Sequence, residues 1–331
     1  MTTVYIPDPV ESLMPFATER AAAEAVGAEL LLGDEHNPTI RDAEVILTTW
    51  IRFPPEEIRK LERCRLIVRY GIGVDTIDLD AATECGIVVA NAPNHCVAEV
   101  ADHSAALILS ALRCVPWLNA QVRAGNWRAA QRAEKSMPRL SSQTLGLIGL
   151  GKIGRQVLRR MVPFGFRTIG YDPYLNGEAV RALGVEPVSF EQLLREADVV
   201  SLHVPLMPTT RHLINAEALA LMKPTATLIN TSRGGVVDEA ALIQALQEDR
   251  LLGAALDVLQ QEPPAADNPL LSFDPLRVIL TPHAAASSDE VLDDLHAEVT
   301  TAFRALLAGQ LPPSVMNPTV RPKQPLRPYG G

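Results

Sequence analysis

Three polar side chains in the second half of the chain have the types needed to hold an anion and move a proton. Arg233 lies in Asn230-Thr-Ser-Arg-Gly-Gly-Val-Val-Asp238, directly after an apolar run. A planar guanidinium at the end of such a run can hold a carboxylate through two hydrogen bonds. His283 lies in Thr281-Pro-His, again after an apolar run, and an imidazole can exchange a proton near neutral pH.

Glu262, in Gln261-Glu-Pro-Pro, could hydrogen-bond the second ring nitrogen of His283. Such a partner would fix the tautomer and favour the protonated ring. Each residue alone has an ordinary interpretation: a surface arginine, a loop acid and a capping or core histidine. Together, Arg233, Glu262 and His283 predict a catalytic set.

A glycine fingerprint, Gly149-Leu-Gly151-Lys-Ile-Gly154, precedes these residues. Its first glycine permits a tight turn, its second lets a pyrophosphate approach, and its third lets the following helix pack closely. An apolar run at 145–148, a helical pattern at 152–161 and Asp172 at the expected distance support a dinucleotide site. Asp172 favours NAD over NADP, because a carboxylate accepts hydrogen bonds from the ribose hydroxyls and repels a 2′-phosphate. The alternative is a glycine-rich turn with an ordinary turn aspartate.

Composition narrows the class of protein. The chain has 331 residues, 47% of them hydrophobic, enough for two domains. A net charge of −9 argues against a nucleic-acid partner. The four cysteines show no metal-binding spacing, and no apolar run is long enough for a membrane span. With a first segment unlike a signal peptide, we expect a cytoplasmic protein without a metal site.

Short apolar runs alternate with amphipathic stretches, which predicts parallel sheets covered by helices. One series of expected strands comprises residues 45–49, 66–70 and 87–91. A second comprises 144–148, 167–171, 199–203, 225–230, 253–256 and 278–280. Long helices are expected at 99–115 and 288–307.

This order predicts an α/β protein with two Rossmann-like domains. We expect a flavodoxin-like substrate domain formed by residues 1–100 and 290–331, with a doubly wound dinucleotide-binding domain, 101–289, inserted into it. The active site is expected in a cleft between them. Residues 312–331 are rich in proline and are expected to form an extended or disordered tail.

Several segments resemble those of the NAD-dependent D-isomer-specific 2-hydroxyacid dehydrogenases. They are the Arg233 segment, Ala255-Leu-Asp-Val followed by Glu262-Pro, and Thr281-Pro-His, with Arg69-Tyr-Gly-Ile-Gly-Val-Asp earlier in the chain. Within the family, the chain is most similar to the phosphoglycerate-dehydrogenase-like and C-terminal-binding-protein-like branch.

The resemblance implies that Arg233 binds the substrate carboxylate, that His283 is the acid/base and that Glu262 orients it. It also implies that Ile72 and Gly73 present backbone N–H groups to the substrate. The residues it implies for the cofactor NAD are Gly149, Gly151, Lys152, Ile153, Gly154, Asp172, His203, Pro205, Thr210, Thr231, Ser232, Arg233, Asp257, His283 and Ala285.

A few further residues bear on the choice of substrate and on the oligomeric state. Arg52 could bind a second anionic group, although an exposed loop arginine is the commoner outcome. Small residues follow His283 where C-terminal-binding-protein relatives carry a tryptophan, which leaves room for a bulkier substrate. The resemblance implies a homodimer through the cofactor domain, with residues 117–139 as a candidate arm. Two alternatives stay open: an NAD(H)-sensing regulatory protein, and an NADP-preferring glyoxylate or hydroxypyruvate reductase, which Asp172 disfavours.

Overall fold

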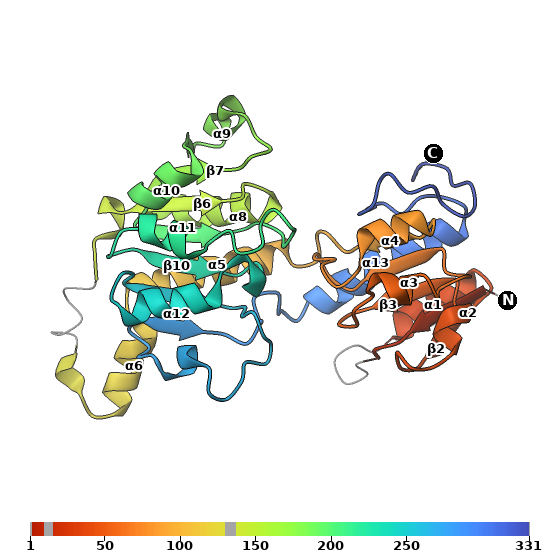
Figure 1. The fold of residues 1–331 in the computed structure, drawn as a ribbon, viewed down its shortest axis with the longest axis horizontal. Helices are drawn as coiled ribbons and strands as arrows, with labels where there is room; N and C mark the ends of the chain where they lie inside the picture. The colour runs from red at the N-terminus through yellow and green to blue at the C-terminus, as the bar shows by residue number, and fades with distance from the viewer. Residues whose placement is uncertain (1, 10–15, 130–136, 331) are drawn as a thin grey trace. The chain divides into compact units, whose positions relative to one another are not determined.

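The computed structural model describes residues 2–9, 16–129 and 137–330. The chain divides into two compact units (Figure 1). The first unit comprises Met1–Cys96 and Ser288–Gly331, and the second comprises Val97–Ser287. Both are built on parallel sheets, so the expected α/β fold with two Rossmann-like domains is confirmed.

The first unit contains a five-stranded parallel sheet of order β2-β1-β3-β4-β5. The strands are β1 (Thr2–Ile6), β2 (Ala28–Leu32), β3 (Val45–Thr48), β4 (Leu66–Arg69) and β5 (Val88–Asn91). The helices are α1 (Ala17–Ala25), α2 (Thr39–Asp42), α3 (Pro55–Ile58), α4 (Leu79–Glu84) and α13 (Val291–Leu307).

Alternate residues of these strands bury opposite faces of the sheet, as the two-residue period of a strand requires. Val45 and Leu47 pack in one cluster with Phe303 of α13 and with alanines of α1. Ile46, between them, packs in the other cluster with Ile58 of α3 and with alanines of α4. Two helical layers therefore cover this sheet.

The second unit contains a parallel sheet of order β12-β11-β10-β9-β6-β7-β8. The strands are β6 (Thr144–Ile148), β7 (Arg167–Tyr171), β8 (Glu186–Pro187), β9 (Val199–Leu202), β10 (Thr227–Asn230), β11 (Gly253–Leu256) and β12 (Val278–Leu280). The strand order reverses between β6 and β9. Open α/β sheets bind ligands at the carboxyl ends of the strands beside such a switch point.

Helices cover both faces of this second sheet (Figure 1). They are α5 (Val97–Leu112), α8 (Lys152–Met161), α9 (Gly177–Ala182), α10 (Phe190–Glu196), α11 (Ala216–Leu221) and α12 (Glu239–Gln247). Helix α6 (Val115–Arg123) follows α5 and packs against it. Short 3₁₀ turns lie at η1 (Trp127–Ala129), η3 (Leu140–Ser142), η4 (Val162–Phe164), η5 (Gly234–Val236) and η6 (Pro269–Ser272).

Local sequence sets the starts of several of these helices. The side chains of Asn176, Ser189, Asn215 and Asp238 each accept a hydrogen bond from a backbone N–H in the first turn of the helix that follows. Each such cap is worth about 1 kcal/mol relative to alanine. The helix expected at residues 99–115 ends instead at Leu112, and α6 begins after Cys114, whose φ of 54° is left-handed.

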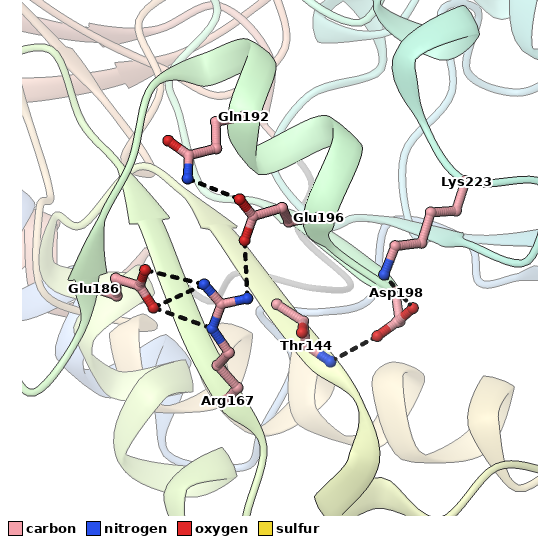
Figure 2. A network of polar contacts seen from close by, with 7 residues as sticks. All are labelled: Thr144, Arg167, Glu186, Gln192, Glu196, Asp198 and Lys223. Atoms are coloured by element: carbon pink, nitrogen blue, oxygen red, sulfur yellow. Dashed lines mark hydrogen bonds and ion pairs between the residues drawn. The ribbon is translucent and has the colours of Figure 1, made fainter.

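Figure 2 shows polar contacts that tie elements of the second unit together. Arg167 of β7 donates three hydrogen bonds to Glu186 of β8 and forms an ion pair of 2.8 Å with Glu196 of α10. Hydrogen bonds from Gln192 and Arg167 lower the pKa of Glu196. Asp198, before β9, accepts from Lys223 and from the Thr144 N–H. A single exposed ion pair contributes little to the free energy of unfolding, so the effect of these contacts comes from the network that joins several elements.

Residues 312–331 were expected to form an extended or disordered tail, and the structure contradicts disorder for the described part, 312–330. Asn317 is buried, and its side chain accepts from the Val89 N–H and donates to the Ile87 carbonyl, 2.9 Å in each case. Lys323 donates to the carbonyls of Leu61 and Glu62. The segment has almost no regular secondary structure, but these contacts pin it to the first unit.

Candidate active site

The candidate residues of the second unit lie at one edge of its sheet, just beyond the carboxyl ends of its strands. Gly149 follows β6, Asp172 follows β7, His203 follows β9, Thr231 to Arg233 follow β10, Asp257 follows β11 and His283 follows β12. Strands of a parallel sheet all end at the same edge, so the topology gathers residues more than 130 positions apart.

The glycine fingerprint adopts the geometry that its sequence predicts. Gly149 has a φ of 90°, and a Cβ there would lie 2.6 Å from the His203 carbonyl oxygen. A Cβ at Gly154 would lie 2.1 Å from the Gly149 oxygen, so the helix can approach only without a side chain. A Cβ at Gly151 would meet open space. This space, at the N-terminus of α8, suits an anionic group that approaches the backbone.

Asp172 lines an open pocket beside this turn. Its Oδ2 accepts from the Leu150 N–H and its Oδ1 from the Tyr174 N–H, both at 2.9 Å. The pocket has a volume of about 430 Å³, and Tyr171, Pro173 and Val188 also line it. Lys152 and Ile153 begin α8 next to this turn. A carboxylate fixed in this way can accept hydrogen bonds from the hydroxyls of a sugar.

The loop after β9 is closed by its own hydrogen bonds. Thr210 Oγ1 donates to the Pro205 carbonyl at 2.6 Å and accepts from the Met207 N–H at 2.8 Å. His203 Nε2 lies 2.9 Å from Ser201 Oγ, and burial lowers the pKa of His203 to about 4. This imidazole is therefore neutral at physiological pH.

Asn230, which the sequence analysis did not single out, organises the loop that carries Arg233. Its Oδ1 accepts from the Ser232 N–H and hydroxyl, and its Nδ2 donates to the Arg233 carbonyl at 2.9 Å. The hydroxyls of Thr231 and Ser104 lie 2.7 Å apart. In the sequence, the signal that could have identified Asn230 is a polar residue at the end of an apolar run.

His283 and Glu262 form the pair that the sequence predicts. The Nδ1 and Oε2 atoms lie 2.6 Å apart, and the side chains are 28% and 35% exposed. Glu262 Oε1 also accepts from the Leu259 N–H at 2.9 Å. Burial raises the pKa of Glu262, but the hydrogen bonds from His283 and Leu259, with the nearby charges of His283 and Arg233, lower it on balance. The carboxylate therefore stays ionised near neutral pH.

Asp257 fixes the backbone around His283. Its Oδ1 accepts from the Thr281 hydroxyl at 2.6 Å and the Ala284 N–H at 2.9 Å, and its Oδ2 accepts from the Ala285 N–H at 2.9 Å. Its carbonyl accepts from the His283 N–H at 2.8 Å. The role of Thr281 in this arrangement was not predicted.

The remaining candidates, Arg52, Ile72 and Gly73, lie in the first unit. Arg52 is exposed, in the loop after β3. Asp8 holds that loop by accepting from the N–H groups of Thr49 and Ile51. Ile72 and Gly73 follow β4, and the Ile72 carbonyl accepts from Asn91 Nδ2 at 2.6 Å.

Among the residues that the structure describes, no cluster of three or more histidine, cysteine or acidic side chains is placed to bind a metal. No single helix in this part of the chain is long and apolar enough to cross a membrane, although α5 and α6 meet the length and composition criteria as a pair bent by 61°.

Residues 105–285 match the model of the NAD-binding domain of the D-isomer-specific 2-hydroxyacid dehydrogenases. The chain belongs to this family. NAD is accordingly its cofactor. The open space at Gly151, at the N-terminus of α8, fits the pyrophosphate of a dinucleotide, and the Asp172 carboxylate could accept hydrogen bonds from a ribose.

Relatives within the family carry different names. A D-3-phosphoglycerate dehydrogenase of Methanocaldococcus jannaschii is 40% identical over 99% of this chain and 62% of its own length. A glyoxylate reductase of Korarchaeum cryptofilum is 41% identical over 78% of this chain and 77% of its own length. This chain thus spans less than two thirds of the phosphoglycerate dehydrogenase.

Solved structures of the family have the same fold. A D-lactate dehydrogenase of Aquifex aeolicus, in complex with NAD and lactic acid, has a TM-score of 0.85 and 30% identity, covering 96% of this chain and 99% of its own. An NADPH-dependent glyoxylate/hydroxypyruvate reductase of Sinorhizobium meliloti has a TM-score of 0.82 and 27% identity, covering 98% and 99%. One of these two similar proteins was thus solved with NAD, and the other is NADPH-dependent.

Proposed function

We propose that this chain is an NAD(H)-dependent oxidoreductase that interconverts a 2-oxo acid and a D-2-hydroxy acid. The observation that carries the proposal is the 2.6 Å contact between His283 and Glu262, formed by loops that follow two neighbouring strands. Family membership supports the reaction class, and the intact set of Arg233, Glu262 and His283 supports catalysis rather than binding alone.

In this proposal, each side chain has one task. Arg233 binds the substrate carboxylate and polarises the adjacent carbonyl. His283 donates a proton from Nε2 to the carbonyl oxygen during reduction and withdraws it during oxidation. Glu262, bonded to Nδ1, keeps Nε2 directed to the substrate and stabilises the protonated ring. When bound, the nicotinamide cofactor would supply a hydride to C2 of the oxo acid in its reduced form, NADH, or accept one from the hydroxy acid in its oxidised form, NAD⁺.

Asp172 supports NADH as the preferred form of the cofactor. Its two oxygens are held by backbone N–H groups at the rim of the pocket, so a 2′-phosphate would meet a fixed negative charge. This argues against an NADP-preferring reductase. Arg52, exposed on the loop that Asp8 holds, is proposed to favour substrates with a second anionic group.

We further propose a cytoplasmic homodimer joined through the cofactor domain. The four cysteines are free, as in proteins of reducing compartments. Val115, Val122 and Trp127 leave apolar surface exposed on α6 and η1 of the second unit, and Trp127 is 81% exposed. Residues 130–136 of the candidate arm lie outside the described residues. Sedimentation of the purified protein would measure the assembly state.

The test of function is oxidation of NADH against a panel of 2-oxo acids: glyoxylate, pyruvate, hydroxypyruvate, and phosphorylated, branched and phenyl-substituted acids. We expect turnover on at least one acid, reduced by about a hundredfold or more in His283→Ala with NADH affinity retained. Turnover that survives in His283→Ala would contradict the assigned role. Tight NADH binding without turnover on any acid would favour the sensing protein.

A further inference from the structure

His103 lies on α5, outside every segment assigned to the reaction so far, yet it contacts the loop of His283. Its Nε2 lies 3.0 Å from Thr281 Oγ1 and 3.5 Å from Asp257 Oδ1. The His103 side chain is 25% exposed, whereas that of Asp257 is fully buried. Helix α5 packs against β10 and β11, so a rigid element presents this imidazole to the carboxyl end of β11.

The directions of the hydrogen bonds follow from the chemistry of the groups. The Thr281 hydroxyl donates its single proton to Asp257 Oδ1, at 2.6 Å. A lone pair of Thr281 Oγ1 is then left for His103, whose Nε2 must carry the proton. The order of donation is thus His103 to Thr281 to Asp257. Each donor in such a chain polarises the next.

Asp257 passes this orientation on to the catalytic loop. Its two carboxylate oxygens accept the N–H groups of Ala284 and Ala285, the two residues directly after His283. His283 has a φ of 53°, a left-handed conformation uncommon in residues other than glycine. The surrounding contacts must hold it there, and the Asp257 carboxylate supplies two of them.

We infer that His103 is a positioning residue, which acts through Thr281 and Asp257 to fix the backbone of His283. The inference rests on the proposed function for its effect on turnover. Its structural half does not: the Ala284 and Ala285 N–H groups should exchange more readily with solvent when the His103 donor is lost.

The test uses the full chain with matched variants. His103→Leu removes the donor, whereas His103→Gln offers an amide N–H of similar reach. Thr281→Val removes the hydroxyl at nearly constant shape. Asp102→Asn is the control, because Asp102 precedes His103 on the same helix but pairs with Arg160. Hydrogen exchange of a peptide that spans residues 281–285 is measured first, with thermal unfolding as a check on folding.

We expect faster exchange of this peptide in His103→Leu and Thr281→Val, and native exchange in His103→Gln and Asp102→Asn. On the best 2-oxo acid, kcat should fall about tenfold in His103→Leu with KM nearly unchanged, since small misplacements of catalytic groups have effects of this size or larger. The pH at which the reduction rate begins to fall should move lower, because a loosened ring makes a weaker contact with Glu262. His103→Gln should restore both.

A double variant tests whether His103 and Thr281 act through one chain of hydrogen bonds or have independent effects. His103→Leu with Thr281→Val should be no slower than the more impaired single variant, because both break one chain of donors. Additive losses, or native exchange and native pH dependence in His103→Leu, would overturn the inference. If the unaltered protein reduces no 2-oxo acid, the proposed function fails, while the exchange data still decide the positioning role.

Discussion

The Nδ1 atom of His283 lies 2.6 Å from the Oε2 atom of Glu262, although 21 residues separate them in sequence. Glu262 is itself held by the Leu259 N–H, and His283 by backbone contacts to Asp257. The carboxylate and the imidazole are therefore each oriented by contacts within the protein. In the proposed reaction, such preorganisation would mean that little rearrangement is needed.

Replacement of Glu262 by glutamine should change the pH dependence of the reaction. The pKa of Glu262 is lowered, so its charge is present at neutral pH and favours the protonated imidazole that reduction requires. In Glu262→Gln, the rate of reduction should fall on the order of tenfold or more at neutral pH and begin its decline at lower pH. Initial rates of NADH oxidation against pH measure this; a superimposable profile would contradict it.

The same carboxylate should affect stability with a defined sign. Because folding lowers the pKa of Glu262, its contribution to the free energy of unfolding is present above the unfolded-state value and is lost as pH falls through the folded value. When the pH is lowered from neutral to below about 4, unfolding by urea should therefore show a smaller loss of stability in Glu262→Gln than in the unaltered protein.

Replacement of Asp172 should weaken the discrimination between cofactors. Asp172→Ala removes the fixed charge at the pocket, so the preference for NADH over NADPH should fall by on the order of tenfold or more. Asp172→Asn keeps an acceptor for the Leu150 N–H and isolates the effect of charge. The ratio of kcat/KM for the two cofactors is the measurement. An unaltered protein that uses both equally would show the assignment to be wrong.

Gly234 and Gly235 offer a matched pair. A Cβ at Gly234 would lie 1.9 Å from the Leu259 carbonyl oxygen, which is backbone and belongs to the turn that holds Glu262. Gly234→Ala should lower the free energy of unfolding by about 2 kcal/mol and reduce kcat. A Cβ at Gly235 would meet the flexible ends of two side chains, Leu206 at 3.1 Å and Arg211 at 3.5 Å, so Gly235→Ala should have a smaller effect. Equal effects in urea titrations and turnover assays would refute this distinction.

Loss of Asn317 should destabilise the protein. Asn317→Ala leaves the Val89 N–H and the Ile87 carbonyl without their partner in the buried edge of the first unit. The expected loss is about 3 kcal/mol, in line with two buried groups left unsatisfied. Gln324→Ala, at an exposed position of the same segment, serves as the control. Similar unfolding midpoints for both variants would mean that residues 312–330 contribute little.

The sequence alone determined the elements whose formation is local. The expected strands at 144–148, 167–171, 253–256 and 278–280 have the observed bounds, because short stretches with an apolar centre that are followed by polar or turn residues can be recognised without a distant partner. The glycine fingerprint likewise determines its backbone conformation locally, since a φ of 90°, as at Gly149, is readily adopted only by glycine. Strands β1 and β2, in the first 32 residues, were missed; their pairing is with each other and with β3.

Only the tertiary structure decided which polar groups support the site. Asp8 accepts a hydrogen bond from the N–H of Thr49, which is 41 residues away in sequence. His103 contacts Thr281, which is 178 residues away. No local pattern marks such partners, because a hydrogen bond between distant segments depends on where the sheet brings them. The same reason explains residues 312–330. Their proline-rich composition predicts that the segment cannot bury much surface, but the rest of the first unit supplies the hydrogen bonds that hold it.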